Sequence, residues 1–263
     1  MMMELVKDKV DCCGCASCVQ VCPKKCLSMK EDEEGFLYPI KDEQSCIDCR
    51  LCEKVCPLKN QQDKLQCKDV YAVMNLDEQE RMASSSGGVF IKLAKYILKQ
   101  NGVVFGAVFN EKYEVCHVAA SSEEQLIPML GSKYLQSRIG NTYKETLTYL
   151  KENRLVLFTG SPCQIKGLYS FLRNKKYVNL ITMDFLCHGV PSPKVWQGHL
   201  DELSSKIFAN KKIADIKFRY KYNGWKGYRL FYTFHDGTSH SVSRDKDPYL
   251  RGFVCSLYSR PSC

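Results

Sequence analysis

The stretch that decides the fold is "CCGCASCVQVCP" (residues 12–23), and its pattern returns as "CIDCRLCEKVCP" (residues 46–57). Both stretches read C-x2-C-x2-C-x3-C-P. Three cysteines spaced three residues apart let one tight loop present three thiols to a common point, and the fourth lies about one helical turn further on. A proline after the fourth cysteine restricts the backbone there and redirects the chain. The repeat therefore predicts two related multi-thiol sites, with the cysteines Cys12, Cys15, Cys18, Cys22, Cys46, Cys49, Cys52 and Cys56.

This run is typical of bacterial ferredoxins that hold two [4Fe-4S] clusters, in which the fourth cysteine of each run ligates the other cluster. The predicted ligands of the first cluster are Cys12, Cys15, Cys18 and Cys56. Those of the second are Cys46, Cys49, Cys52 and Cys22. The alternative is a pair of zinc sites, which also use CxxC pairs. Zinc sites usually join two such pairs across a longer gap, so two complete runs favour iron–sulfur clusters.

The composition is that of a water-soluble protein with an unusual number of cysteines. The chain has 263 residues, 16 of them cysteine, and a formal net charge of +9. Its start has no apolar core of a signal peptide, and its apolar runs are too short for a membrane span, so we expect a cytoplasmic protein. Clustered cysteines in a reducing compartment indicate metal binding. The positive charge is either a solvated surface or a docking surface for an acidic electron carrier.

The rest of the chain predicts an α/β domain. We expect an α+β ferredoxin-like domain at 1–60, a linker at 61–68, and a larger domain in two parts, 69–160 and 161–263. Strands are expected at 70–75, 103–110, 154–160 and 177–189, with helices between them. Towards the end, a β-hairpin with Asp236-Gly237 at its turn is expected.

Four short stretches of this larger domain could carry chemistry. They are "SSSGGVF" (84–90), "GSKYLQS" (131–137), "GSPCQIKG" (160–167) and "LCHGVPSP" (186–193). Glycines at a helix start favour an anion such as phosphate, although an ordinary helix cap explains the first stretch equally well. Cys163 and Cys187 follow predicted strands, where α/β folds often place functional groups. A single cysteine is by default a buried apolar residue.

In this order, and with the ferredoxin pair before them and "DPYLRGFVCSLYSRPSC" after them, these stretches resemble the β subunit family of coenzyme F-420 hydrogenases and dehydrogenases. The resemblance is to the branch with a fused N-terminal ferredoxin domain. It implies an iron–sulfur flavoprotein that passes electrons between clusters, a flavin (FAD or FMN) and a redox partner protein or coenzyme. The flavin pocket that it implies comprises Ser86, Gly87, Gly88, Lys133, Tyr134, Gln136 and Ser137.

The family pattern continues beyond "RPSC", so we expect the chain to be a fragment. If Cys163, Cys187 and Cys263 converge, they would supply three ligands of a third [4Fe-4S] site, incomplete here.

Two other functions remain open. One is a ferredoxin-like carrier or adaptor without turnover, since the fold alone does not decide function. The other is nucleic-acid binding by the basic and aromatic residues of 206–232. Alternation along strands explains that segment better, so no nucleic-acid partner is expected.

Overall fold

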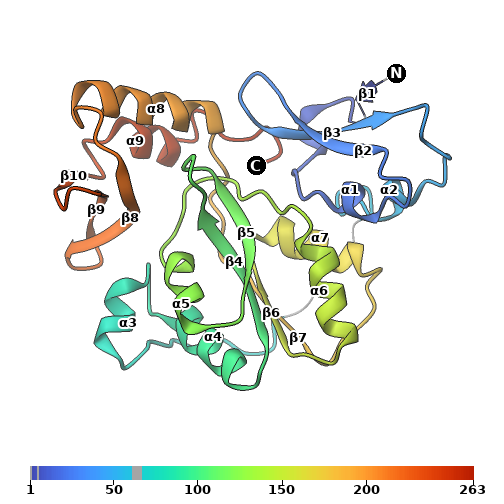
Figure 1. Cartoon of the computed structure of the whole chain (residues 1–263), viewed down its shortest axis with the longest axis horizontal. Helices are drawn as coiled ribbons and strands as arrows, with labels where there is room; N and C mark the ends of the chain where they lie inside the picture. The colour runs from blue at the N-terminus through green and yellow to red at the C-terminus, as the bar shows by residue number, and fades with distance from the viewer. Residues whose placement is uncertain (1, 5, 61–66) are drawn as a thin grey trace.

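The computed structural model describes residues 2–4, 6–60 and 67–263, arranged as an N-terminal cysteine-rich region and a larger α/β body (Figure 1). In the cysteine-rich region a three-stranded antiparallel sheet of order β1-β3-β2 lies beside short helices. Most of the linker predicted at 61–68 lies outside the described residues. The elements of this region are β1 (Met2–Glu4), the 3-10 helix η1 (Lys9–Asp11), α1 (Ser17–Val21), β2 (Leu27–Glu31), β3 (Leu37–Asp42) and α2 (Leu51–Lys54).

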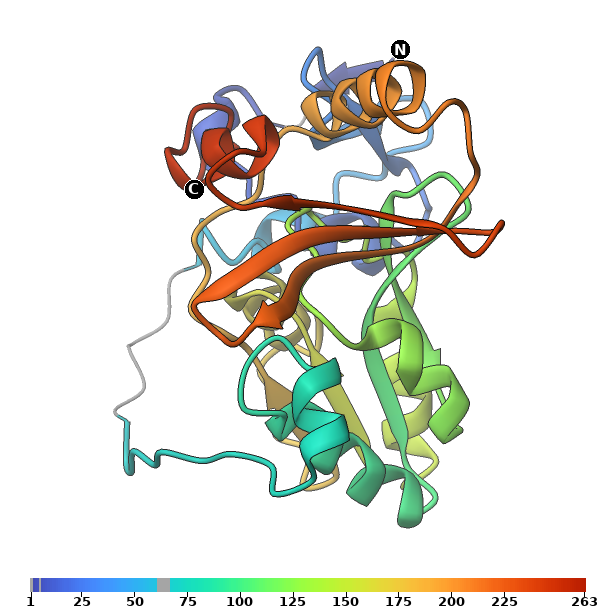
Figure 2. The same ribbon diagram turned by 90° about the vertical axis from the view of Figure 1, so that its left-hand side faces the viewer.

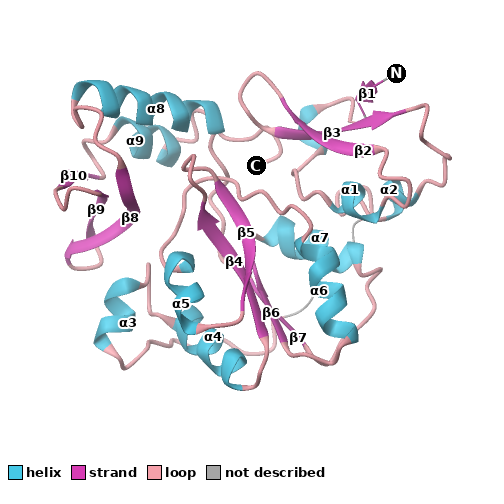
Figure 3. Cartoon of the chain, in the orientation of Figure 1, coloured by secondary structure: helices cyan, strands magenta, loops and turns pink. Residues whose placement is uncertain are grey.

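The body is built on a four-stranded sheet of order β5-β4-β6-β7. Strands β4, β6 and β7 are parallel to one another, and β5 is antiparallel to β4. Helices cover both faces (Figure 3), as parallel strands require. The elements are α3 (Glu78–Ala83), α4 (Val89–Lys99), β4 (Val103–Phe109), β5 (Val115–Ala120), α5 (Glu123–Leu126), η2 (Ile127–Met129), α6 (Thr142–Lys151), β6 (Val156–Thr159), α7 (Pro162–Phe171) and β7 (Leu180–Met183).

Alternating residues of the central strands feed two separate cores. On one face, Phe105 and Phe158 stack with ring centroids 5.4 Å apart and pack with residues of α6 and α7. On the other face, Val104 and Leu157 pack with residues of α4 and α5. Since successive side chains of a strand point to opposite faces, a strand covered on both faces is apolar throughout. The continuous apolar run "RLVLF" predicted this arrangement.

A third unit lies beside the central sheet. It is an antiparallel sheet of order β10-β9-β8, which Figure 2 shows beneath α8 and α9. Trp196 of α8 packs against Phe218 and Tyr249 in its core. The predicted turn is confirmed: Gly237 has a φ of +81°, and Thr238 N–H donates to Asp236. The elements are α8 (Pro193–Lys206), β8 (Ile213–Asn223), β9 (Gly227–Phe234), β10 (Ser239–Ser243) and α9 (Pro248–Val254).

The strand predicted at residues 70–75 is wrong. The segment is extended but pairs with none of the strands in the described part of the chain. Val70 and Tyr71 are 89% and 77% exposed. Only its end is held, by a hydrogen bond from Asn75 N to Gly87 O. Apolar and β-branched residues favour a strand, but a strand also needs a neighbouring edge, which a local pattern does not reveal.

The cysteine-rich region packs directly on the body through α1. The Ser17 hydroxyl donates to the Gly167 carbonyl in α7 at 2.7 Å, and Gln20 Oε1 accepts from Tyr143 N–H in α6 at 3.1 Å. Ser17 and Gln20 are buried, and Ala16 belongs to the core of the body. Buried and satisfied polar contacts of this kind fix the two parts in register.

Gly167 allows this close approach, and replacing it should loosen the contact. A Cβ at this position would lie 2.8 Å from Cys15 Cβ and 2.9 Å from Ser17 Oγ. We expect Gly167→Ala to lower the free energy of unfolding by about 1–3 kcal/mol, the usual cost of overpacking. Urea titration under anaerobic conditions measures it. Gly198→Ala in α8 is the control, because nothing lies within 4 Å of that Cβ. Equal stability of the two variants would contradict the prediction.

Candidate functional site

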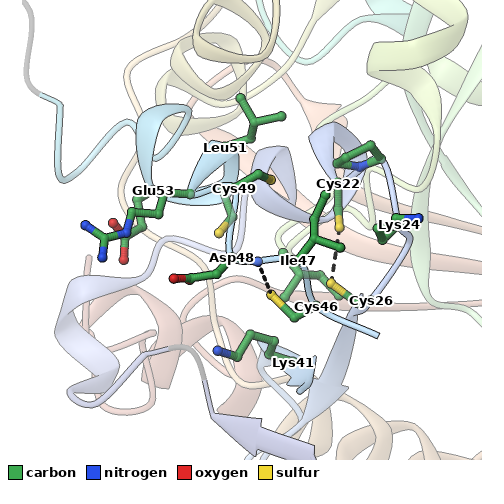
Figure 4. Close-up of a pocket in the computed structure, with 14 residues that line it drawn as sticks. Cys22, Lys24, Cys26, Lys41, Cys46, Ile47, Asp48, Cys49, Leu51 and Glu53 are labelled. Atoms are coloured by element: carbon green, nitrogen blue, oxygen red, sulfur yellow. Dashed lines mark hydrogen bonds between the residues drawn. The ribbon is translucent and has the colours of Figure 1, made fainter. Parts of the chain in front are cut away.

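Four cysteines from both runs line one cavity in the cysteine-rich region (Figure 4). The cavity has a volume of about 60 Å³ and lies between the end of α1 and the loop that leads into α2. Its wall contains the four thiols predicted for the second cluster, with Cys26 beside them: Cys22, Cys46, Cys49 and Cys52. The structure therefore brings the fourth cysteine of the first run to the first three of the second.

The first quartet is gathered in the same way. Burial raises the pKa of the Cys18 thiol, and the nearby charges of Cys15, Cys12 and Cys56 raise it further. These three are the residues predicted to share a cluster with Cys18.

The two loops also have matching backbones. The second and fourth residues after the first cysteine of each run are left-handed, at Gly14 (+69°), Ala16 (+60°), Asp48 (+50°) and Arg50 (+57°). This repeated turn is what allows each loop to present three thiols together.

The donor set fits a [4Fe-4S] cluster better than a single ion. Among residues 2–4, 6–60 and 67–263, no three Cys, His, Asp or Glu side chains are gathered closely enough to hold one metal ion. The four thiols of the second quartet instead surround a space. Cubane clusters need thiolates at four separate corners, which is what this arrangement offers.

A much larger cavity, of about 750 Å³, lies in the body. It opens at the carboxyl ends of the parallel strands β6 and β7 and beside the start of α4, the usual place for ligands in an α/β sheet. All seven residues of the flavin pocket implied by the resemblance line it: Ser86, Gly87, Gly88, Lys133, Tyr134, Gln136 and Ser137.

The two stretches that supply these residues are tied to each other. The Ser85 hydroxyl accepts hydrogen bonds from Ser132 N–H and, at 2.8 Å, from the Ser132 hydroxyl. Nearby, Lys133 Nζ donates to the carbonyls of Leu130 (3.1 Å) and Gly131 (3.3 Å). Burial lowers the pKa of Lys133 to about 8. The amine is thus a cation with one N–H still available, placed in the wall of the cavity.

Sequence reasoning missed His117, a buried residue of β5 in the same wall. Its Nε2 lies 2.8 Å from the Thr159 carbonyl and its Nδ1 2.5 Å from Ser137 Oγ. A carbonyl can only accept, so Nε2 carries the hydrogen and Nδ1 accepts from the Ser137 hydroxyl. Burial lowers the pKa of His117 to about 4, which keeps it neutral. His117 therefore fixes Ser137 with its lone pairs free towards the cavity.

This pair predicts a pH dependence of stability. The folded-state pKa of His117, about 4, lies below the ordinary value of 6.5. The unfolded chain therefore binds the proton first, and stability falls as the pH drops from 6.5 towards 4, by up to roughly 3 kcal/mol. We expect His117→Gln to remove this slope from the unfolding free energy, whereas His235→Gln, an exposed control on the hairpin turn, should keep it. Parallel pH profiles for both variants would contradict the prediction.

The three remaining predicted cysteines lie in one region at the edge of the large cavity. Cys163 starts α7, where its Sγ lies 3.2 Å from Ser161 Oγ. Burial raises the pKa of Cys187, whose thiol also feels the charges of Cys163 and Cys263. Cys263 packs against Gly189, at 3.2 Å from the position of a Cβ there.

Cys13, which lies between two predicted ligands, belongs to the same region. A hydrogen bond from its thiol lowers the pKa of Cys163. No feature of the first run alone indicates that Cys13 reaches a residue 150 positions away.

Comparisons with known proteins match both parts of the chain. Residues 11–60 match the family model of the 4Fe-4S dicluster domain. Residues 153–263 match the model that describes the C terminus of the coenzyme F420 hydrogenase/dehydrogenase beta subunit. No curated protein matches the chain.

Among solved structures, the chain is similar to one in the F420-reducing [NiFe] hydrogenase complex from Methanosarcina barkeri. The identity is 16% and the TM-score 0.46, over 72% of this chain and 62% of that chain. The chain thus spans less than two thirds of the length of that relative. Within the described residues, no helix is long and apolar enough to span a bilayer.

Proposed function

Because this chain belongs to the coenzyme F420 hydrogenase/dehydrogenase beta subunit family and carries a 4Fe-4S dicluster domain, we propose that it relays electrons between two [4Fe-4S] clusters, a flavin and a redox partner. The observation that carries the proposal is the large cavity, which gathers all seven residues implied as a flavin pocket directly beside the cysteine-rich region. When bound, the clusters would supply one-electron steps and the flavin would couple them to two-electron chemistry.

The residues of the cavity have distinct roles in this proposal. The backbone N–H groups of residues 86–88 precede α4, an eleven-residue helix whose N-terminus favours a phosphate. Lys133 offers a cation for an anionic group of the flavin. Ser137, held by His117, offers a fixed hydroxyl oxygen as an acceptor. Apolar residues such as Met129 and Leu250 in the wall exclude water from part of the space.

The partner is proposed from charge and from the family. A formal net charge of +9 favours an acidic partner protein. The matching family is one of beta subunits, and this supports a role as one component of a redox assembly.

Anaerobic purification with iron, sulfide and flavin measured together tests the proposal. Two clusters correspond to about eight iron atoms per chain, and we expect one flavin beside them. A chain that holds its clusters but never a flavin would instead be an electron carrier or adaptor. Absence of both would reject the electron-transfer role of the two sites.

We also propose that Cys163, Cys187 and Cys263 supply three ligands of a third [4Fe-4S] site. Their placement at the edge of the large cavity supports it. After anaerobic reconstitution, the parent should hold more than about eight iron atoms per chain, and Cys187→Ser should return the count to about eight. Equal iron contents would contradict the proposal.

A further inference from the structure

Arg260 is a fully buried arginine at the junction between the cysteine-rich region and the body. Its side chain is 1% exposed, and its backbone N–H donates to the Val190 carbonyl. The C-terminal segment that carries it runs beside the cysteine-rich region in Figure 1. The guanidinium lies 4.3 Å from the ring centroid of Tyr38 and 5.5 Å from that of Phe36.

Every direction of the guanidinium fork is used. Nε donates to the Cys12 carbonyl at 2.8 Å, and Nη1 donates to Gln136 Oε1 at 2.9 Å. Nη2 donates to the Leu37 carbonyl at 2.9 Å and lies 3.7 Å from Cys12 Sγ. The Gln136 amide in turn donates to the Cys13 carbonyl at 2.8 Å. Arg260 therefore holds the first cysteine loop and a residue of the large cavity at the same time.

The charge of Arg260 is not balanced by a carboxylate. Across the described ranges, the ion pairs found do not include Arg260. A buried cation without an anion is costly, because the charge loses its hydration. The ionisable atom that it faces is Cys12 Sγ, which is anionic once the thiol is a cluster ligand.

We propose that Arg260 sets the reduction potential of the first cluster and favours its reduced form. The inference rests on the proposed function, because it requires Cys12 to be a ligand. Reduction adds one electron and hence one negative charge to the cluster and its thiolates. A buried cation that donates to a ligand sulfur stabilises that added charge, and the potential rises.

The effect should be confined to the first cluster. Lys24, Lys41 and Arg50 line the cavity of the second quartet, but Cys49 there is exposed, so water and salt screen those charges. Arg260 acts from a buried position. The first cluster would then have a potential suited to exchange with the large cavity, to which Gln136 connects it.

The first loop is shaped around this arginine. Gly14 has a φ of +69°, and a Cβ there would lie 2.9 Å from Arg260 Nη1 and 2.8 Å from Gln136 Nε2. A larger residue would displace both partners. The close fit indicates a built contact and not an incidental approach of the chain end.

The test is an anaerobic redox titration of the whole chain, followed by EPR, with dithionite as the electron donor. In a Cys49→Ser background, which retains only the first quartet, Arg260→Met should lower the reduction equilibrium constant about tenfold. This corresponds to about 59 mV for a one-electron couple. Arg260→Lys, which keeps the charge but loses the fork, should give a smaller shift in the same direction. Arg251→Met, an exposed arginine of α9, should give none.

Three outcomes would overturn the inference. One is an unchanged potential in Arg260→Met with a normal iron content. Another is an equal shift of both clusters when Cys49 is intact. If Arg260→Met fails to hold iron, an unshifted Arg260→Lys variant overturns it. Loss of both clusters from the parent would instead reject the proposed function, so the two failures are distinguishable.

Discussion

Replacing Cys22 with serine should remove the same cluster as replacing Cys49, although the two residues belong to different runs. Cys22 lies at the end of α1 and lines the cavity of the second quartet. We expect iron to fall from about eight to about four atoms per chain in each variant, with the same remaining EPR signal. Cys56→Ser should remove the other signal. This crossing of the fourth ligand follows from the geometry of both loops.

The matched control is Cys26→Ser. Its Sγ lies 3.3 Å from Cys22 Sγ and lines the same cavity, yet Cys26 is not part of the four-cysteine pattern. This variant should keep about eight iron atoms per chain. If Cys26→Ser loses a cluster while Cys22→Ser keeps it, the fourth ligand is Cys26 and the predicted set is wrong. If Cys22→Ser and Cys18→Ser remove the same cluster, the ligands do not cross.

The cysteine quartets could be predicted because their geometry is written in short spacings. Within each run the fourth cysteine lies ten residues after the first, so the loop and one helical turn determine where three thiols point. The four-stranded sheet was also predictable, since β4 and β6 are apolar along their length and helices follow them. These signals are local, and the structure and the family models confirm the fold classes that they indicate.

The missed residues depend on contacts between distant parts of the chain. Arg260 meets Cys12 across 248 positions, and His117 meets Thr159 across 42. Neither a lone arginine nor a lone histidine in a strand carries a pattern that names its partner. The segment 70–75 failed for the related reason that a strand needs an edge, and its own residues do not specify one.

Lys133 should be the residue of the large cavity that matters most for flavin affinity. Two of its three N–H groups are satisfied by the carbonyls of Leu130 and Gly131, which leaves one for a ligand. A hydrogen bond to a charged partner contributes about 1.5–3 kcal/mol. We therefore expect Lys133→Met to weaken flavin binding by roughly ten- to a hundredfold, measured by fluorescence titration of flavin-free protein.

The pH profile separates a charge effect from simple packing. Burial holds the pKa of Lys133 at about 8, so the amine is charged below that pH and neutral above it. Affinity of the parent for flavin should fall as the pH rises through about 8, and Lys133→Met should be weak and flat over the same range. Lys112→Met, an exposed lysine outside the cavity, should retain both the affinity and the slope. A Lys133→Met variant with full affinity and an unchanged slope would show that the cation does not meet the ligand, and the flavin's anionic group would then have to lie against residues 86–88 at the start of α4.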